Sequence, residues 1–329
     1  MINKLREKSK DTWDKIREKS SQIKHPNSYR HSSKVHKAVR IIILAIIFVA
    51  AIAELMLGIM IYGFKSETKF VKTASKYVPM PVVFSSHGVV TASNYFEEKD
   101  YINHFYASTG QSDVDNTELS KQILTQLAEN NIIKDEAIKY KLTISNKDVD
   151  DAYVKIVEQN GGNESVQKVL NDLYGLSIKQ FKNLIRIQLL RDKFNSDIIM
   201  RVTVKHILVR VDESATEDQI AAAKVKIDGY RKEIDAGLDF SEAAKKYSED
   251  VGSNENGGLL DPFARGDMVK PFEDSAFSLP VGQISEPVKT SFGWHIIRVE
   301  DRTGIIDKSF DEWLSELKSK SITVNLLQI

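Results

Sequence analysis

The chain has 329 residues, and at ~100–200 residues per domain this length predicts two domains with attached segments. No cysteine is present, which excludes disulfides, thiolate metal sites, a cysteine nucleophile and a lipidated N-terminal cysteine. The formal net charge of zero argues against a nucleic-acid-binding protein. That zero is a sum of unequal parts. Residues 1–40 hold 12 Lys/Arg against 4 Asp/Glu, whereas residues 65–329 hold 34 against 41.

An uncharged apolar run separates these two parts, broken only by Glu54. The 24 residues from Ile41 to Phe64 exceed the ~20 that a helix needs to cross a bilayer. The cationic excess on the N-terminal side predicts that residues 1–40 stay in the cytoplasm and that the acidic body lies outside. Two alternatives are signal-peptide cleavage after Ala51-Ile52-Ala53 and a buried core helix. Glu54 costs roughly 2.5–3.5 kcal/mol in mid-membrane, and the sequence offers it no partner.

The basic tail contains a repeat, because LREKS at residues 5–9 returns as IREKS at residues 16–20. Eleven residues make almost three helical turns, so the apolar positions of the tail fall on one side of a helix. This pattern is typical of a basic amphipathic helix on the inner membrane face. A solvated charged tail that only sets topology is the equal alternative. The apolar positions are Ile2, Leu5, Trp13, Ile16 and Ile23.

Residues 65–91 are predicted to be a spacer, in which Pro79 and Pro81 disfavour helix and two short valine-rich runs favour strands. Residues 92–200 carry apolar residues at helical spacing, and Ser177 with Gln180 forms a capping box. We therefore expect a mainly helical region here. Its wide apolar faces either pack together or leave a groove for an extended chain.

The pattern changes near residue 201, where an apolar strand is followed by two capped helices and a final strand at 294–299. Residues 201–300 therefore predict an α+β domain of ordinary size. In residues 301–329, Ser309 and Glu312 form a capping box before a strongly apolar helix face and a terminal strand. We expect this last piece to return to the helical region, so that the α+β domain is inserted within it.

No nucleotide-binding loop, metal-spaced histidine cluster or hydrolase elbow occurs in the sequence, so no cofactor and no metal is expected. Of the seven histidines, His206 and His295 lie within β-rich apolar runs. Each of them alone is typical of a hydrogen-bonded structural histidine.

Residues 203–299 nevertheless resemble a parvulin-type peptidyl-prolyl isomerase domain. The similar stretches are KHILVR at 205–210, DFSEAAKKYSED at 239–250, RGDMVKPFEDSAFSLPVGQISEPVKT at 265–290 and FGWHIIRV at 292–299. More loosely, residues 117–200 and the segment SFDEWLSELKSKSITVNLL resemble the chaperone region of PrsA- and SurA-type extracytoplasmic foldases. The resemblance implies a four-stranded antiparallel sheet with helices, inserted in a mainly helical chaperone domain.

The resemblance also implies which residues act. Two facing histidines match His206 and His295, the acidic position beside the reacting amide matches Asp250, and a hydroxyl of the histidine network matches Thr290. For the residues of the proline pocket the alternative role is plain core packing. The pocket positions match Leu260, Phe263, Met268 and Phe272.

Two departures from the family pattern bear on activity. The loop after the first strand reads VDESATEDQ, which is acidic where phosphate-directed parvulins are basic, so phosphoserine selectivity is not expected. The stretch GGLLDPF has Asp261 and Pro262 where the family usually has glycine. If that glycine supplied a positive φ or allowed the substrate to approach closely, activity would be weakened.

The sequence thus predicts a single-pass membrane protein that isomerises X–Pro bonds and holds unfolded or newly exported polypeptides. It contacts the membrane through residues 41–64 and, in the amphipathic alternative, also through the basic tail, and it binds no nucleic acid. The competing hypothesis is a holdase whose parvulin domain only binds peptide. A third, a scaffold that recruits a cytoplasmic partner, depends on the repeat of the tail alone.

Overall fold

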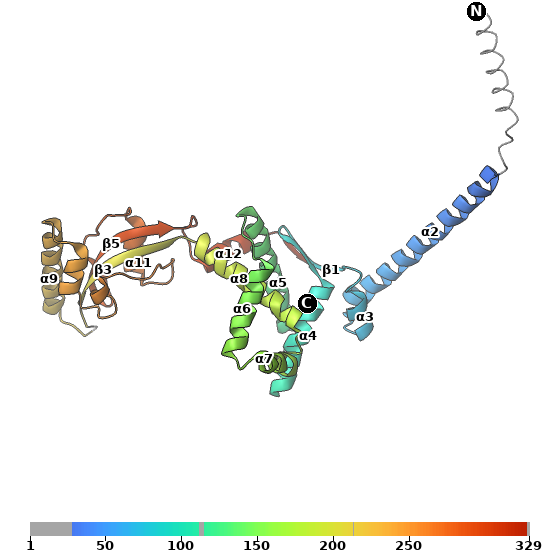
Figure 1. Cartoon of the computed structure of the whole chain (residues 1–329), viewed down its shortest axis with the longest axis horizontal. Coiled ribbons are helices and arrows are strands. Elements are labelled where there is room, and N and C mark those ends of the chain that lie inside the picture. Colours follow the sequence, from blue (N-terminus) through green and yellow to red (C-terminus); the bar gives the residue numbers. More distant parts are fainter. Residues whose placement is uncertain (1–27, 112–114, 213, 328–329) are drawn as a thin grey trace, which may run out of the picture. The chain divides into compact units, whose positions relative to one another are not determined.

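The computed structural model describes residues 28–111, 115–212 and 214–327 (Figure 1). The amphipathic helix predicted for the basic tail lies outside these residues. The chain divides into two compact units, Met1–Val78 and Pro79–Ile329.

The first unit is dominated by the apolar segment. Helix α2 spans Ser28–Gly58 and passes into a π-helical turn, η1, over Ile59–Gly63. Residues Lys37–Gly63 are long enough to cross a membrane, and their most apolar 18-residue window has a mean hydropathy of 2.8. The helix therefore begins earlier than the predicted start at Ile41. A short helix, α3, follows at Lys69–Ala74, begun by the side chain of Thr68, which accepts a hydrogen bond from the N–H of Val71.

A small antiparallel sheet opens the second unit, in the order β2-β1-β6. Strands β1 (Pro81–Ser85) and β2 (Gly88–Thr91) form a hairpin, and β6 (Thr323–Asn325) pairs with β1 from the far end of the chain. The predicted spacer at 65–91 thus contains one helix and two paired strands.

Six helical elements follow the hairpin in the described residues up to Asp197. Capping boxes begin two of them, through Ser145 and Ser177, as the sequence predicts for Ser177. The elements are α4 (Ala92–Thr109), α5 (Asn116–Lys139), α6 (Asn146–Gln159), α7 (Asn163–Val169), η2 (Leu170–Tyr174) and α8 (Ile178–Asp197).

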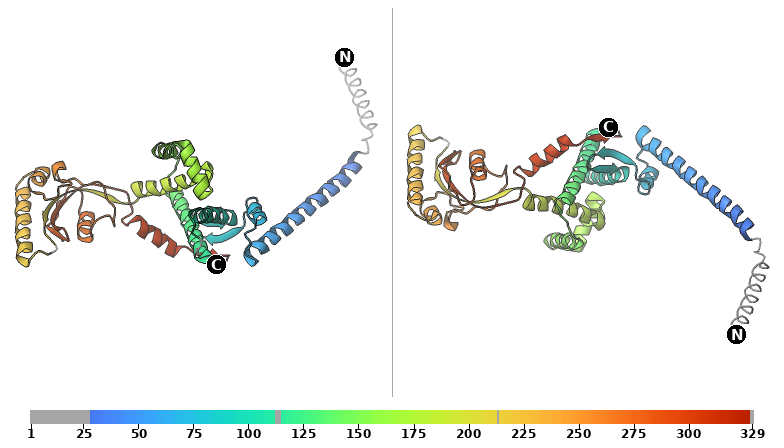
Figure 2. Two further views of the ribbon diagram at one scale, coloured as in Figure 1. Left: turned by 90° about the horizontal axis from the view of Figure 1, so that it is seen from below. Right: turned by 90° about the horizontal axis from the view of Figure 1, so that it is seen from above.

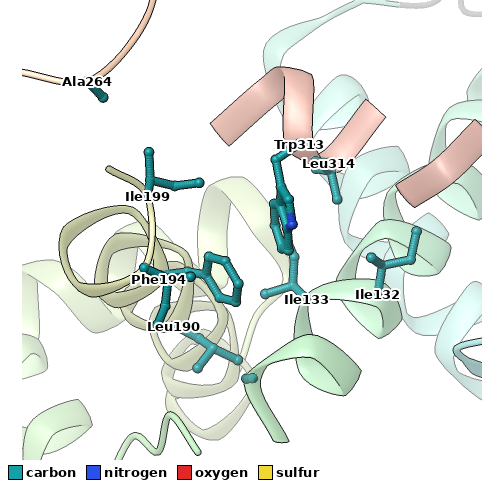
Figure 3. Close-up of a cluster of buried hydrophobic side chains, with 10 residues drawn as sticks. Ile132, Ile133, Leu190, Phe194, Ile199, Ala264, Trp313 and Leu314 are labelled. Carbon is teal, nitrogen blue, oxygen red and sulfur yellow. The ribbon is translucent and has the colours of Figure 1, made fainter. Parts of the chain in front are cut away.

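The C-terminal helix α12 (Phe310–Lys320) returns to these helices. Its Trp313 stacks on Phe194 of α8, with ring centroids 4.2 Å apart. Figure 3 shows Trp313 extending from α12 toward Phe194 and Ile133 of α5, inside a cluster of buried apolar side chains. Residues more than a hundred positions apart therefore share one core.

Between α8 and α12 the chain forms the α+β part, which is built on a sheet of three strands in the order β3-β5-β4. All pairs in this sheet are antiparallel. The elements are β3 (Arg201–Arg210), α9 (Glu217–Asp235), α10 (Phe240–Tyr247), the 3-10 turn η3 (Asn254–Asn256), α11 (Lys270–Ser278), β4 (Val288–Thr290) and β5 (Gly293–Thr303).

The prediction of a four-stranded sheet is wrong in this respect. The segment beside β3 makes only two isolated bridges, Lys205 to Leu259 and Val202 to Phe263. Leu259 and Phe263 are four positions apart, whereas their partners Lys205 and Val202 are three apart. The two segments therefore cannot keep a regular pairing register. Pro262 also lacks an N–H group to donate.

Two apolar cores cover the two faces of the sheet, as the alternation of a strand requires. Ile207 and Val209 of β3 and Ile296 of β5 face α9 and α10. Val204 of β3 and Ile297 of β5 face the opposite side, where α11 packs. This second face carries the site described next.

Candidate active site

Two histidines meet on the α11 face of the sheet. His206 on β3 shares its face with Val204, and His295 on β5 shares its face with Ile297, because side chains two positions apart point the same way. The Nδ1 atoms lie 3.3 Å apart, and the rings stack at 17° with centroids 5.5 Å apart. Both residues are buried, at 5% and 4% exposure. The pairing predicted from the resemblance is therefore present as a direct contact.

Asp250 holds the outer nitrogen of His206. It follows the end of α10, and its Oδ2 lies 2.9 Å from Nε2 of His206. Ser253 lies at the same point, with Oγ 3.0 Å from that nitrogen and its hydroxyl donating to Asp250. Sequence reasoning missed Ser253, although its position three residues after Asp250 was the available signal.

Thr290, the last residue of β4, closes the other end of the network. Its Oγ1 lies 2.8 Å from Nε2 of His295 and accepts the N–H of Phe292 at 3.0 Å. The hydroxyl of Thr290 is buried. All four predicted polar residues thus form one continuous hydrogen-bonded chain.

The donors and acceptors available on each side chain determine the direction of every hydrogen bond in this network. An ionised Asp250 only accepts, so His206 carries its proton on Nε2 and leaves Nδ1 as an acceptor. His295 then donates from Nδ1, and its Nε2 accepts the hydroxyl proton of Thr290. Every proton in the chain points toward Asp250, with both imidazoles neutral.

The surroundings keep the imidazoles neutral. Burial lowers the pKa of His295 to about 3, helped by the neighbouring His206 and opposed by Asp250. Burial also lowers the pKa of His206, and the hydrogen bond and charge of Asp250 oppose this without reversing it. Partial burial alone raises the pKa of Asp250, but hydrogen bonds from Ser253, His206 and the N–H of Gly252 outweigh it and lower the pKa.

Aromatic side chains cover the histidines from the α11 side. Phe272 of α11 stands edge-on to both rings, with centroids 5.6 Å from His206 and 5.2 Å from His295. Phe263 touches Phe272 and Phe277. Phe263 and Phe272 are only 2% and 3% exposed, which fits the core-packing alternative for both. Leu260 and Met268 are half-buried at the edge of the same cluster. They present the apolar surface that a ligand can reach.

Gly258, the second glycine of the pair Gly257-Gly258, determines how closely the segment that leads to Leu260 and Phe263 packs against β3. The N–H of His206 donates to the carbonyl of Gly258 at 2.8 Å. Gly258 has φ +79°, and a Cβ there would lie 2.2 Å from the carbonyl oxygen of His206. Only glycine meets both demands.

Asp261 and Pro262 fit the backbone without strain. Among the described residues, the non-glycine positions with positive φ are Lys65 and Lys141, so Asp261 has an ordinary conformation. Both Asp261 and Pro262 are exposed. The concern that a glycine was needed at this point for its positive φ therefore does not hold in this chain.

The sequence matches the family described as "Rotamase: PPIC-type PPIASE domain" over residues 206–301. That span contains the polar chain and its apolar wall, so this part of the protein is a parvulin-type peptidyl-prolyl isomerase domain. "Foldase protein PrsA 3" of Bacillus anthracis is 31% identical over 232 residues, covering 69% of this chain and 74% of that protein. The chain belongs to the PrsA foldase family.

"Chaperone SurA" of Chromobacterium violaceum is 49% identical over 98 residues, which are 30% of this chain and 22% of that protein. The crystal structure of the PrsA peptidylprolyl isomerase from Bacillus anthracis is 29% identical, with a TM-score of 0.29, covering 60% of this chain and 86% of that one. The chain spans 66% and 74% of the length of two PrsA relatives.

Proposed function

We propose that this protein is a membrane-anchored peptidyl-prolyl isomerase and chaperone that assists the folding of exported polypeptides. The observation that carries the proposal is the hydrogen-bonded chain from Asp250 to Thr290 beneath the ring of Phe272. His206, Asp250, Thr290 and His295 are proposed as the catalytic set. Leu260, Phe263, Met268 and Phe272 are proposed to bind substrate, with Phe263 acting from within the core.

The reaction needs no covalent bond to the protein. Rotation about X–Pro faces a barrier of ~18–20 kcal/mol because resonance stiffens the amide. Each ~1.4 kcal/mol removed speeds the exchange tenfold. The planar amide is strongly dipolar and the twisted transition state is less so. An apolar surface at Met268 and Leu260 that grips the proline ring therefore favours the twisted state.

The hydrogen-bonded residues from Asp250 to Thr290 are then proposed to orient Asp250 beside the substrate amide. Its neutral imidazoles add no charge beneath the amide, and the carboxylate of Asp250 is the one anionic end. Asp250 is also the most accessible member, with 23% of its side chain exposed. It is placed to act on the amide directly, while His206 and its neighbours hold it in position.

Phosphorylated substrates are not favoured. The loop at 211–219 is acidic, whereas binding of a phosphate group calls for arginine or lysine. We therefore propose that the enzyme accepts X–Pro bonds without requiring phosphoserine or phosphothreonine.

Residues 41–64 are proposed to anchor the chain as an uncleaved span, with residues 1–40 in the cytoplasm and the C-terminal domains outside. The excess of Lys/Arg in residues 1–40 supports this orientation. Because the chain has no cysteine, single cysteines at Ser9 and Val281 test it with a membrane-impermeant maleimide on intact cells. Labelling at Val281 alone is expected, and labelling at Ser9 alone contradicts the orientation.

The proposed chaperone part is the helical region at 92–200 with the returning segment 301–329. A mostly apolar cavity of about 370 Å³ supports a holding role, because it can receive apolar side chains of an unfolded client. This observation also favours the second candidate function, a holdase without isomerase activity. The cavity is lined by Tyr101, Ile156, Val166, Leu170, Tyr174, Phe181 and Leu184, among others.

An isomerisation assay separates the two functions. We expect the full chain in nanodiscs to accelerate cis–trans exchange of an Ala-Pro peptide and to show no preference for a phosphoserine-Pro peptide. Asp250→Ala and Met268→Ala are expected to reduce kcat/KM, whereas Val281→Ala, an exposed control at 55%, leaves it unchanged. Wild-type protein without activity contradicts the enzyme and leaves the holdase.

An aggregation assay tests the chaperone part independently. The full chain with Asp250→Ala is expected to suppress aggregation of an unfolding client as well as the wild type does. Absence of protection by both proteins contradicts the holding role.

A further inference from the structure

The segment that follows the apolar span carries features that isomerase and chaperone functions do not use. It comprises residues 64–78, all within the first unit, and includes helix α3. We propose that this segment is an interfacial anchor that docks on the anionic headgroups of the outer membrane face. The proposal depends on the proposed membrane span.

Chain length keeps α3 close to the bilayer. Five residues separate Gly63, where the span ends, from Lys69, where α3 begins. Even fully extended, the six Cα–Cα steps from Gly63 to Lys69 reach at most ~22 Å. They are not extended, because the N–H of Phe64 donates to the carbonyl of Ile59 at 3.1 Å and that of Ser66 to Met60 at 2.9 Å. These bonds close the end of the helix, so the first residues after Gly63 stay against its last turn.

The burial of two residues near the end of the span indicates that another segment packs against it. Leu57 and Ile61, one helical turn apart in the last part of the span, are 4% and 1% exposed, while Leu55 and Met56 beside them are exposed. Figures 1 and 2 show α3 beside this end of α2 in every view. Leu57 lies only about 9 Å before Gly63 at 1.5 Å per residue, so a helix beside this last part of the span lies near the boundary between the apolar core and the headgroups.

Helix α3 has one buried side and one exposed aromatic side, as expected for a helix at a membrane interface. Val71 and Ser75, four positions apart, are buried. Phe70 and Tyr77 are two turns apart and therefore share another side, which is open at 68% and 83% exposure. After Ala74 the N–H groups of Ser75 and Val78 donate four positions back and those of Lys76 and Tyr77 three positions back, so the chain continues in helical turns. Aromatic side chains are enriched at membrane interfaces, where one end is apolar and the other wet.

The charge of the segment points to anionic lipid. Lysine occurs at 65, 69, 72 and 76, against one acidic residue, Glu67, which pairs with Lys72. Lys69 and Lys76 are exposed and two turns apart, beside the aromatic side. Translocated flanks are usually poor in lysine, so topology alone does not account for these four. Attraction to anionic headgroups does.

Site-directed spin labelling of the full chain tests the proposal, because the chain has no cysteine and every introduced cysteine is unique. Four single variants in phosphatidylglycerol-containing nanodiscs are compared: Ile46→Cys within the span, Phe70→Cys, Tyr77→Cys, and Val281→Cys as the exposed control. Accessibility to oxygen and to a water-soluble nickel complex is measured for each label.

We expect labels at Phe70 and Tyr77 to be shielded from nickel relative to Val281 and to lie shallower than Ile46. In that background, Lys69→Gln and Lys76→Gln are each expected to lower the ratio of shielded to exposed label about fivefold. Pure phosphatidylcholine nanodiscs are expected to show little shielding.

The outcomes separate this proposal from the anchor on which it depends. A label at Ile46 that is open to nickel contradicts the membrane span itself. A lipid-exposed Ile46 with Phe70 and Tyr77 as open as Val281 overturns the interfacial anchor and leaves the span in place. Equal shielding in neutral nanodiscs overturns the assignment of anionic headgroups.

Discussion

The neutral state of His295 makes a quantitative prediction about acid stability. In the folded domain its pKa is lowered to about 3, first by burial and then by His206. In the unfolded chain a histidine has its ordinary pKa of about 6.5. At pH values between these two pKa values, His295 binds a proton in the unfolded chain but not in the folded domain. The stability due to this difference is fully present above pH ~6.5 and is lost progressively as pH falls toward 3.

Linkage gives the size of the effect. A histidine with pKa values of about 6.5 unfolded and about 3 folded lowers the free energy of unfolding by about 2 kcal/mol between pH 7 and pH 5. His206 acts in the same direction because its pKa is also lowered. Asp250, whose pKa lies below the ordinary carboxyl value, titrates only below this window. The histidine pair therefore dominates the loss among the buried groups of the site.

The assay is urea unfolding of a fragment of residues 199–306 at pH 7 and pH 5. His206 and His295 are the only histidines in this fragment. The matched variant is His295→Leu, which loses the hydrogen bond to Thr290 at both pH values and so lowers stability throughout. We expect its loss between pH 7 and 5 to be smaller than that of the wild type by about 2 kcal/mol. Equal losses in the two proteins would refute a buried neutral His295.

Three further predictions follow from packing and backbone geometry. Gly258→Ala is expected to lower domain stability by about 2–4 kcal/mol in chemical denaturation, because the added Cβ meets backbone, whereas Gly282→Ala, also left-handed but with nothing within 4 Å, loses about 1 kcal/mol. Trp313→Ala is expected to destabilise the helical core by about 3–5 kcal/mol and Ile322→Ala, 77% exposed, by less than about 0.5, and similar losses in the two would contradict the docking of the C-terminal helix. Asp261→Gly is expected to leave kcat/KM within about twofold, since this exposed residue has no positive φ to relieve, and a large gain would show that the family glycine matters for activity.

The sequence by itself determined the features that depend on local pattern. The length of the run from Ile41 to Phe64 specified a helix able to span a membrane, because that requirement is met by consecutive residues. The caps at Ser177 and Ser309 were readable for the same reason, since a capping box is complete within four positions. The order and spacing of the motifs across residues 203–299 are specific enough to indicate the parvulin family without the tertiary structure.

Tertiary structure alone decided how distant residues meet. His206 and His295 are 89 positions apart, and their contact depends on the register of β3 against β5, which no local pattern specifies. Ser253 entered the site only because the turn after α10 brings its hydroxyl to His206. The missing fourth strand follows from a mismatch in spacing between two segments, visible only when both are paired. Helix caps and apolar runs depend on neighbouring residues, so the sequence shows them directly. Strand register and packing depend on pairs of residues that are distant in sequence, so they are defined only once the chain has folded.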